Sequence, residues 1–175
     1  MITVGSIVPE LVVSAYRRDE PDPILCSLAG HERWIVLFFY PRDFTFVCPT
    51  ELGAFAELEQ AFAAEEADLV AASTDSYWSH KAWFESHAML AAANYPVIAD
   101  TAHELADAFG VLTTDGTALR GTFVIDPEGV VRHASITDLN VGRSPAETLR
   151  VLQALRTGEL CPVGWHPGES FLKAA

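Results

Sequence analysis

The chain has few positive charges and lacks any long apolar run. Only two of its 175 residues are lysines, Lys81 and Lys173, and the formal net charge is −13. So acidic a surface repels phosphate backbones and anionic lipid headgroups, which disfavours nucleic acid and membrane surfaces as partners. No apolar run approaches the ~20 residues of a membrane span. Residues 1–5 show neither a basic flank nor an apolar signal core, so we expect a cytoplasmic protein.

Cysteine is scarce and irregularly placed. The three cysteines are an odd number and include no Cys-x-x-Cys pair, which fits a reducing compartment and a chemically used thiol better than a disulfide scaffold. The chain also lacks a glycine-rich phosphate loop, and its six histidines show no spacing that makes a metal site. We therefore expect no cofactor and no metal.

The length and an apolar fraction of one half indicate one globular domain with a substantial core. Alternating patterns predict strands at 10–16, 34–40, 68–73, 95–99, 119–126 and 130–137, and helices at 49–66, 76–90, 102–109 and 145–157. This order predicts an α/β protein, a central mixed sheet with helices on both faces on the thioredoxin-like plan. We expect the domain to occupy residues 1–158 and a proline- and glycine-rich extended tail to occupy 159–175.

Cys48 lies where an apolar strand pattern runs through a short loop into an amphipathic helix pattern. The first N–H groups of a helix have no intrahelical acceptor and the helix dipole is positive there, so a thiolate at this place is stabilised. Most free cysteines are simply small buried hydrophobes. Here the constrained and polar neighbours Thr45, Pro49 and Glu51 favour a reactive thiol.

The run Phe-Thr-Phe-Val-Cys-Pro-Thr-Glu-Leu at 44–52, with Pro41 ahead of it, resembles the active site of the peroxiredoxins. The wording is similar to that of the typical two-cysteine enzymes, the branch that includes the peroxide-reducing component of alkyl hydroperoxide reductase. Further segments resemble the family at 79–83, 120–126, 141–144 and 159–162, so the resemblance covers nearly the whole chain. It independently implies a thioredoxin-like fold with an N-terminal extension.

The resemblance implies a role for each matched residue. Cys48 would attack a hydroperoxide and become a sulfenic acid, while Thr45, Arg120 and the Cys48 backbone N–H would polarise the O–O bond. Pro41 would shelter the sulfur from water. Glu51 and Arg143 would orient Arg120, and Trp83 is expected to pack around the site.

Cys161 is implied as the resolving thiol, which would form a disulfide with Cys48 of a second subunit. An external dithiol protein would then reduce the disulfide: a thioredoxin, a flavin-containing reductase subunit or an alkylhydroperoxidase D-type partner. The resemblance further implies a homodimer, assembled as a ring of five dimers. Cys26 sits in an apolar run and is expected to be a packing residue.

Two other functions remain open on the sequence. The same fold could serve as a peroxide sensor or a holdase chaperone. A thiol–disulfide oxidoreductase is less favoured, because position 51 is Glu51 rather than a second cysteine, and Arg120-Gly121 stands where a thioredoxin has a proline. Neither the reductant nor the preferred peroxide, hydrogen peroxide or an alkyl hydroperoxide, can be read from the sequence.

Overall fold

The computed structural model describes residues 1–173, and within them seven strands form one mixed sheet. The strands are β1 (Val12–Tyr16), β2 (Ile24–Ser27), β3 (Trp34–Phe39), β4 (Ala67–Ser73), β5 (Val97–Ala99), β6 (Arg120–Ile125) and β7 (Val131–Thr137). The helices are α1 (Cys48–Glu57), α2 (Glu59–Ala64), α3 (Tyr77–Ser86), α4 (Glu104–Ala108) and α5 (Pro145–Thr157), with a 3₁₀ turn, η1 (Ala88–Leu90). The α/β, thioredoxin-like architecture expected from the sequence is confirmed.

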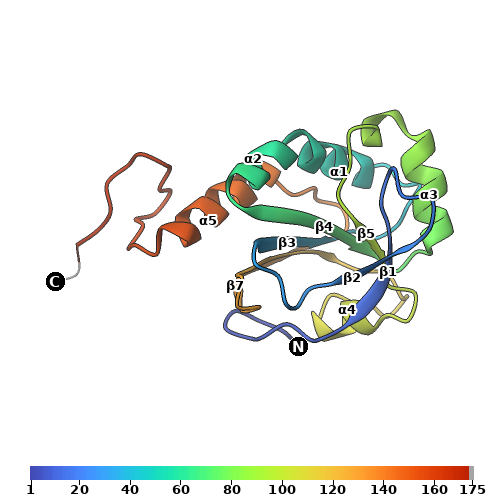
Figure 1. Cartoon of the computed structure of the whole chain (residues 1–175), viewed down its shortest axis with the longest axis horizontal. Coiled ribbons are helices and arrows are strands. Elements are labelled where there is room, and N and C mark those ends of the chain that lie inside the picture. The colour runs from blue at the N-terminus through green and yellow to red at the C-terminus, as the bar shows by residue number, and fades with distance from the viewer. Residues whose placement is uncertain (174–175) are drawn as a thin grey trace.

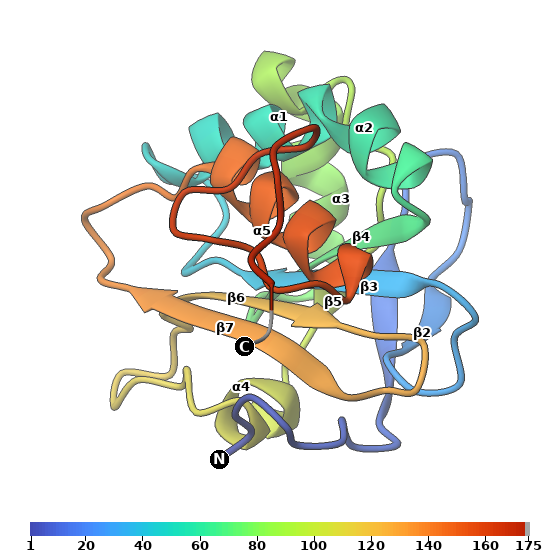
Figure 2. The same cartoon turned by 90° about the vertical axis from the view of Figure 1, so that its left-hand side faces the viewer.

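The sheet has the order β2-β1-β5-β4-β3-β6-β7, and β3, β4 and β5 run parallel at its centre. Helices α1, α2, α3 and α5 cover one face and α4 covers the other (Figures 1 and 2). Successive side chains of β3 therefore enter two different cores: Val36 and Phe38 join the core under α1, and Ile35 and Leu37 join the core on the α4 side. This explains why β3 reads as a continuous apolar run.

Two expectations about the elements are wrong. The hairpin strand β2 was not predicted, because its short stretch follows a polar, proline-bearing turn, yet it pairs antiparallel with β1. The helix predicted over 49–66 is divided at Leu58, whose backbone leaves helical geometry (φ −98°, ψ 3°). The change of direction keeps the rings of Phe55 and Phe62 together in one core, with centroids 6.1 Å apart.

The predicted helix ends are confirmed where the sequence supplies caps. Ser76 and Ser144 each accept a hydrogen bond from the backbone N–H three residues later, at the starts of α3 and α5. Gly158 ends α5 in the left-handed conformation (φ 66°), which glycine adopts without a steric penalty. The chain leaves the domain at this glycine.

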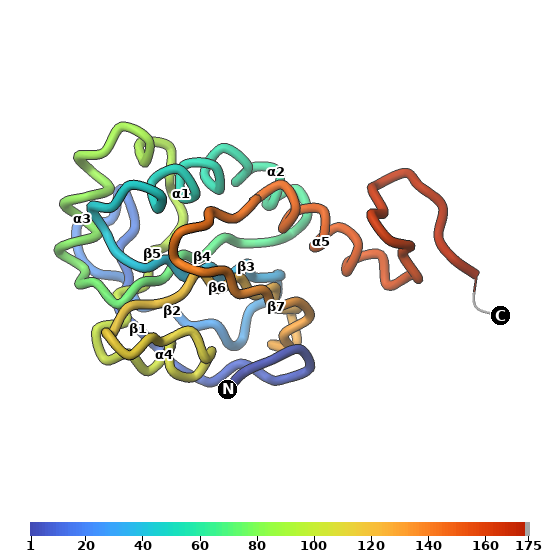
Figure 3. The backbone as a smooth tube through the Cα atoms, turned by 180° about the vertical axis from the view of Figure 1, so that it is seen from behind, coloured from blue at the N-terminus to red at the C-terminus, as the bar shows by residue number. Residues whose placement is uncertain are grey.

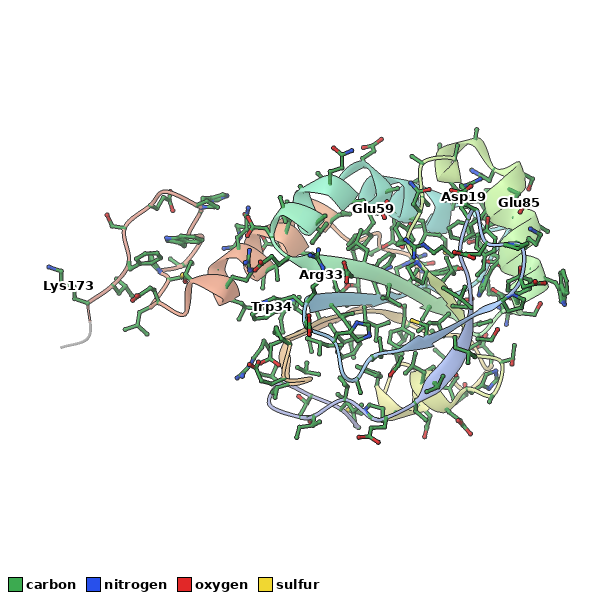
Figure 4. All side chains as sticks on the ribbon, viewed as in Figure 1. Asp19, Arg33, Trp34, Glu59, Glu85 and Lys173 are labelled. Atoms are coloured by element: carbon green, nitrogen blue, oxygen red, sulfur yellow. The ribbon has the colours of Figure 1, made fainter. Side chains whose placement is uncertain are left out.

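Beyond Gly158 the described part of the tail, residues 159–173, contains no helix or strand and projects past the end of α5 (Figure 1). It turns back on itself: the Leu172 N–H donates to the Leu160 carbonyl (2.8 Å), and the Trp165 ring stacks on Phe171 (5.5 Å). In Figure 4 its side chains lie apart from those around the sheet, with Lys173 near the far end. The last two residues of the predicted tail lie outside the described residues.

The helices of residues 1–173 are all too short or too polar to cross a bilayer.

Gly121 offers a test of how tightly the sheet packs beside the candidate site. It lies in buried β6, where a Cβ atom would come 2.7 Å from Val111 Cγ1 and 2.9 Å from the Phe123 ring. We expect Gly121→Ala to lower the free energy of unfolding by about 1–3 kcal/mol through overpacking, as measured by urea denaturation. Gly142→Ala is the control, because its Cβ would meet its nearest atoms at an ordinary 3.7 Å. Equal stability of both variants would contradict the close packing.

Candidate active site

Cys48 is the first residue of α1 and is 1% exposed. The loop from β3 delivers it there, and Pro49 follows in the first turn, where its missing N–H removes no helical hydrogen bond. Its N–H therefore belongs to the set of helix-terminal donors that have no acceptor within the helix. The predicted placement of this thiol at a strand–helix junction is confirmed.

Arg120, the first residue of β6, brings a guanidinium to the sulfur. Its Nη1 lies 3.4 Å from Cys48 Sγ, although the two residues are 72 positions apart. The other side of the guanidinium is held by the Leu139 carbonyl, which accepts from Nε (3.0 Å) and Nη2 (2.7 Å). The Leu139 carbonyl is a positioning group that the sequence did not reveal, because a backbone acceptor leaves no residue-type signal.

Glu51, one turn after Cys48, joins two buried arginines. Arg120 Nη1 donates to its Oε2, while the Arg143 backbone N–H (2.7 Å) and Nε (2.9 Å) donate to its Oε1. Arg143 also donates to the Gly121 carbonyl (2.9 Å), which ties it to the strand that carries Arg120. The structure thus brings together four residues singled out in the sequence: Cys48, Glu51, Arg120 and Arg143.

The charges of this cluster are incomplete without an anion at sulfur. Two guanidiniums and one carboxylate, all at most 5% exposed, leave one positive charge facing a site shielded from water. A Cys48 thiolate balances that charge. Burial lowers the pKa of Arg143 and the contact with Glu51 opposes this, so Arg143 keeps its proton at any physiological pH. The same charge can stabilise a departing oxygen anion.

Pro41 and Thr45 belong to the loop that precedes Cys48. Pro41 is buried and Thr45 is half-buried. The Thr45 hydroxyl donates its proton to the Arg42 carbonyl (2.9 Å), so its lone pairs are free to accept a hydrogen bond from an incoming group. Such an acceptor suits the proton of a hydroperoxide, whereas Arg120 is a donor.

Trp83 packs against the loop rather than against the sulfur. The indole is 1% exposed, and its centroid lies 5.9 Å from that of Phe44 and 6.1 Å from that of Tyr40. It therefore supports the loop from below, as expected of a packing residue near the site.

The other two cysteines are far from this cluster in function and setting. All three thiols are free. Cys161 is half-buried in a cleft between α5 and the tail, where its sulfur lies 3.5 Å from the Thr157 hydroxyl. Cys26 lies in β2 and packs against the core on the α4 side. Burial raises the pKa of Cys26 to about 11, which suits a packing residue.

A buried polar group under the loop was missed in the sequence. The Asp43 carboxylate accepts from the Tyr40 hydroxyl (2.7 Å) and lies 2.9 Å from His80 Nδ1. A signal was available, since Tyr40 and Asp43 lie within the motif run and His80 lies in the matching segment 79–83. The three residues come from a strand end, a loop and a helix, so only the fold places them together.

Comparison with known proteins gives the same answer as the geometry. Residues 5–134 match the model of the AhpC/TSA family. A "putative peroxiredoxin in rubredoxin operon" of Clostridium pasteurianum is 41% identical over 174 residues, covering 97% of this chain and 98% of the relative. Peroxiredoxin prdx-2 of Caenorhabditis elegans is 49% identical over 156 residues, covering 84% and 78%.

Solved structures agree. The reduced 2-Cys peroxiredoxin of Plasmodium vivax superposes with a TM-score of 0.92 at 30% identity, covering 97% of this chain and 92% of that one. Mycobacterium tuberculosis AhpC superposes with a TM-score of 0.83 at 36% identity, covering 95% and 99%. The chain therefore belongs to the AhpC/TSA family and is a typical two-cysteine peroxiredoxin of the AhpC type, a thiol-dependent peroxidase.

Proposed function

We propose that Cys48 is the peroxidatic thiol and that it reduces hydrogen peroxide and alkyl hydroperoxides. The observation that carries this assignment is the 3.4 Å approach of Arg120 Nη1 to Cys48 Sγ inside a buried cluster fixed by Glu51. The thiolate attacks the terminal oxygen of the hydroperoxide, an S–O bond forms and the O–O bond breaks. The leaving oxygen takes a proton and departs as water or an alcohol, and Cys48 is left as a sulfenic acid.

The surrounding groups act on the O–O bond. Low pKa alone cannot make a thiolate fast, because its nucleophilicity falls with its pKa. In this proposal Arg120 donates to the peroxide oxygens, Thr45 accepts the hydroperoxide proton, and the Cys48 N–H faces developing negative charge. Pro41 shields the sulfur, and Glu51 and Arg143 hold Arg120 in place. Trp83 supports the loop.

Removal of the Arg120 charge gives the sharpest test of this site. We expect Arg120→Ala to slow the second-order reaction of the reduced enzyme with hydrogen peroxide by about 10²–10³-fold, the usual cost of one charge-stabilising donor. The rate is measured by competition with a haem peroxidase, and Cys48→Ser, expected to be inactive, sets the baseline. A loss under threefold for Arg120→Ala, or peroxide consumption by Cys48→Ser, would contradict the assignment.

Cys161 is proposed to resolve the sulfenic acid across a subunit boundary. Its sulfur attacks Cys48 sulfur, the S–S bond forms, the S–O bond breaks and water leaves. The tail projects beyond the α2 and α5 end of the molecule, whereas α1 begins toward α3 (Figures 1 and 3). A thiol carried away from its own active site is suited to meet that of a partner. An external dithiol protein then reduces the disulfide, and free cysteines support a cytoplasmic location.

Non-reducing electrophoresis tests the resolving thiol. Peroxide-treated wild type is expected to run as a covalent dimer, and Cys161→Ser is expected to run as a monomer while its first oxidation keeps the wild-type rate. Cys26→Ser is the matched control and should still form the dimer. A covalent dimer in Cys161→Ser would transfer the resolving role to Cys26.

The homodimer is proposed to form through β7. This strand ends the sheet, and within residues 1–173 only β6 pairs with it. An unpaired edge can add the same edge of a second copy across a two-fold axis. Figure 2 shows β7, α5 and the tail on the same side of the molecule, so pairing there brings the tail toward the partner. Fully exposed Val163 and exposed Leu160 and Leu172 give the tail an apolar surface to bury.

A second surface is proposed to join dimers into a ring of five. Phe44 and Phe46 on the catalytic loop are 63% and 95% exposed, and they line a hollow with Trp83 and His87. Adjacent exposed aromatic side chains of this kind mark an interaction surface. This surface is separate from β7, so the two contacts can act together and close a ring.

Light scattering on the reduced protein tests both surfaces. We expect Phe46→Asp to reduce the ring to dimers, and Ile136→Asp in β7 to weaken the dimer itself, because each places a charge in an apolar contact. Leu25→Asp, on the opposite edge strand β2, is the control and should leave the mass unchanged. A monomeric wild type at micromolar concentration would rule out the assembly.

A further inference from the structure

Three buried side chains under the catalytic loop have no part in the chemistry described so far. Asp43 lies in the loop, Tyr40 ends the run of β3 and His80 lies in α3, and all three are at most 7% exposed. The Tyr40 hydroxyl donates to Asp43 Oδ1 (2.7 Å), and His80 Nδ1 lies 2.9 Å from Asp43 Oδ2. Groups this polar are buried only where their hydrogen bonds are satisfied.

The hydrogen bonds fix how many protons the cluster holds. His80 Nε2 lies 3.2 Å from the Ile98 carbonyl, which can only accept, so Nε2 carries a proton. A second proton must lie between Nδ1 and Asp43 Oδ2, since two lone pairs would repel at that distance. Burial and the neighbouring Asp43 raise the pKa of Tyr40 well above its ordinary value, so its hydroxyl keeps the proton that it donates. The cluster is therefore closed, with every polar hydrogen directed to an acceptor.

Asp43 is also held through its backbone. Its N–H donates to Asp75 Oδ2 (2.8 Å), and that carboxylate oxygen accepts from the Ser73 hydroxyl (3.1 Å). The loop is thus tied at one residue to β4, to α3 and to the end of β3. Asp43 stands midway between Pro41 and Thr45, the two loop residues proposed to act at the sulfur.

The residue after this anchor has a strained backbone. Phe44 adopts φ 55°, a left-handed conformation that costs a residue with a side chain of order 1 kcal/mol or more. Such a conformation persists only where the surroundings impose it. On one side Asp43 is held as described, and on the other the Thr45 hydroxyl bonds the Arg42 carbonyl and the Phe44 ring packs on Trp83.

We propose that Asp43, held by Tyr40 and His80, is a positioning residue for the peroxide step. It imposes the left-handed turn at Phe44 and so places Thr45 and Pro41 around Cys48. Without this anchor the turn relaxes toward ordinary backbone angles, and the acceptor on Thr45 leaves the path of the hydroperoxide. The inference rests on the proposed role of Cys48 as the peroxidatic thiol.

The geometry predicts which substitution restores the function. An asparagine at position 43 has the shape of aspartate: its amide oxygen can accept from Tyr40, and its amide nitrogen can donate to a neutral His80 Nδ1. An alanine can do neither. The anchor therefore depends on hydrogen-bond geometry rather than on charge, and Asp43→Asn should retain what Asp43→Ala loses.

The experiment measures the second-order rate of oxidation of the reduced enzyme by hydrogen peroxide at 25 °C. Asp43→Ala is expected to be about 10-fold to 100-fold slower than wild type, the scale on which a misplaced catalytic group slows a reaction. Asp43→Asn is expected to stay within about threefold of wild type. Asp100→Ala is the matched control: this carboxylate is 2% exposed and caps α4 through the Leu105 and Ala106 N–H groups, away from the loop.

Loss of stability alone would affect Asp43→Ala and Asp100→Ala alike, so the melting temperature of each is measured beside its rate. The proposal is overturned if Asp43→Ala stays within threefold of wild type, if Asp43→Asn is as slow as Asp43→Ala, or if Asp100→Ala is equally slowed. Should Asp43→Ala fail to fold, Tyr40→Phe removes one bond of the anchor with little change of shape. It is expected to be slower than wild type by threefold or more, and an unchanged rate overturns the proposal.

Cys48→Ser separates this inference from the proposed function. Peroxide consumption by Cys48→Ser would remove the basis of both. An inactive Cys48→Ser together with a fast Asp43→Ala would leave the proposed function intact and refute the role of Asp43 alone.

Discussion

The active site depends on one buried carboxylate that bridges two buried guanidiniums. Glu51 accepts hydrogen bonds from Arg120 and Arg143, and it sits one helical turn from Cys48. Burying a charge without a partner is very unfavourable, so neither arginine could occupy this place without Glu51. The cluster keeps one positive charge, which an anionic sulfur or a departing oxygen can balance. Charge that supports the reaction is thus held in place by charge that supports the fold.

This cluster explains why the site needs the whole sheet. Cys48 and Glu51 arrive on α1, Arg120 arrives at the start of β6, and Arg143 arrives in the loop before α5. β3 lies between β4 and β6 and leads into the loop before α1, so the sheet brings these segments to one end of the molecule. Backbone carbonyls complete the site: those of Leu139 and Gly121 fix the two guanidiniums. The rigid sheet positions the groups, and the loop and first helical turn carry the reactive atoms.

The two thiols proposed to react with each other are kept apart within a single chain. Cys48 is buried in the helix-covered core, whereas Cys161 is held in a tail that folds on itself beyond α5. The Arg150 guanidinium donates to the Trp165 carbonyl (2.8 Å), so the tail has a defined shape before it meets a partner. A free β7 edge and an apolar tail surface on the same side of the molecule give such a partner a place to bind. Separation within one chain and proximity between two chains follow from the same arrangement.

The sequence by itself determined the elements and the reactive residue. The apolar run of β3, the serine caps of α3 and α5 and the glycine that ends α5 act through neighbouring residues, so each could be predicted locally. The motif around Cys48 identified its own thiol and, by resemblance, Arg120, Glu51 and Arg143. The strand β2 and the break at Leu58 could not be predicted, because pairing with β1 and packing of Phe62 override weak local preferences.

Only the tertiary structure decided which groups meet. The Leu139 carbonyl that aims Arg120 has no side-chain signature, and the contact of Tyr40 and Asp43 with His80 joins residues 37 to 40 positions apart. The left-handed turn at Phe44 occurs at a residue type that ordinarily avoids it, so no local rule predicts it. Local sequence sets the conformations that a segment prefers, whereas contacts between distant segments supply the energy that holds an active site away from those preferences.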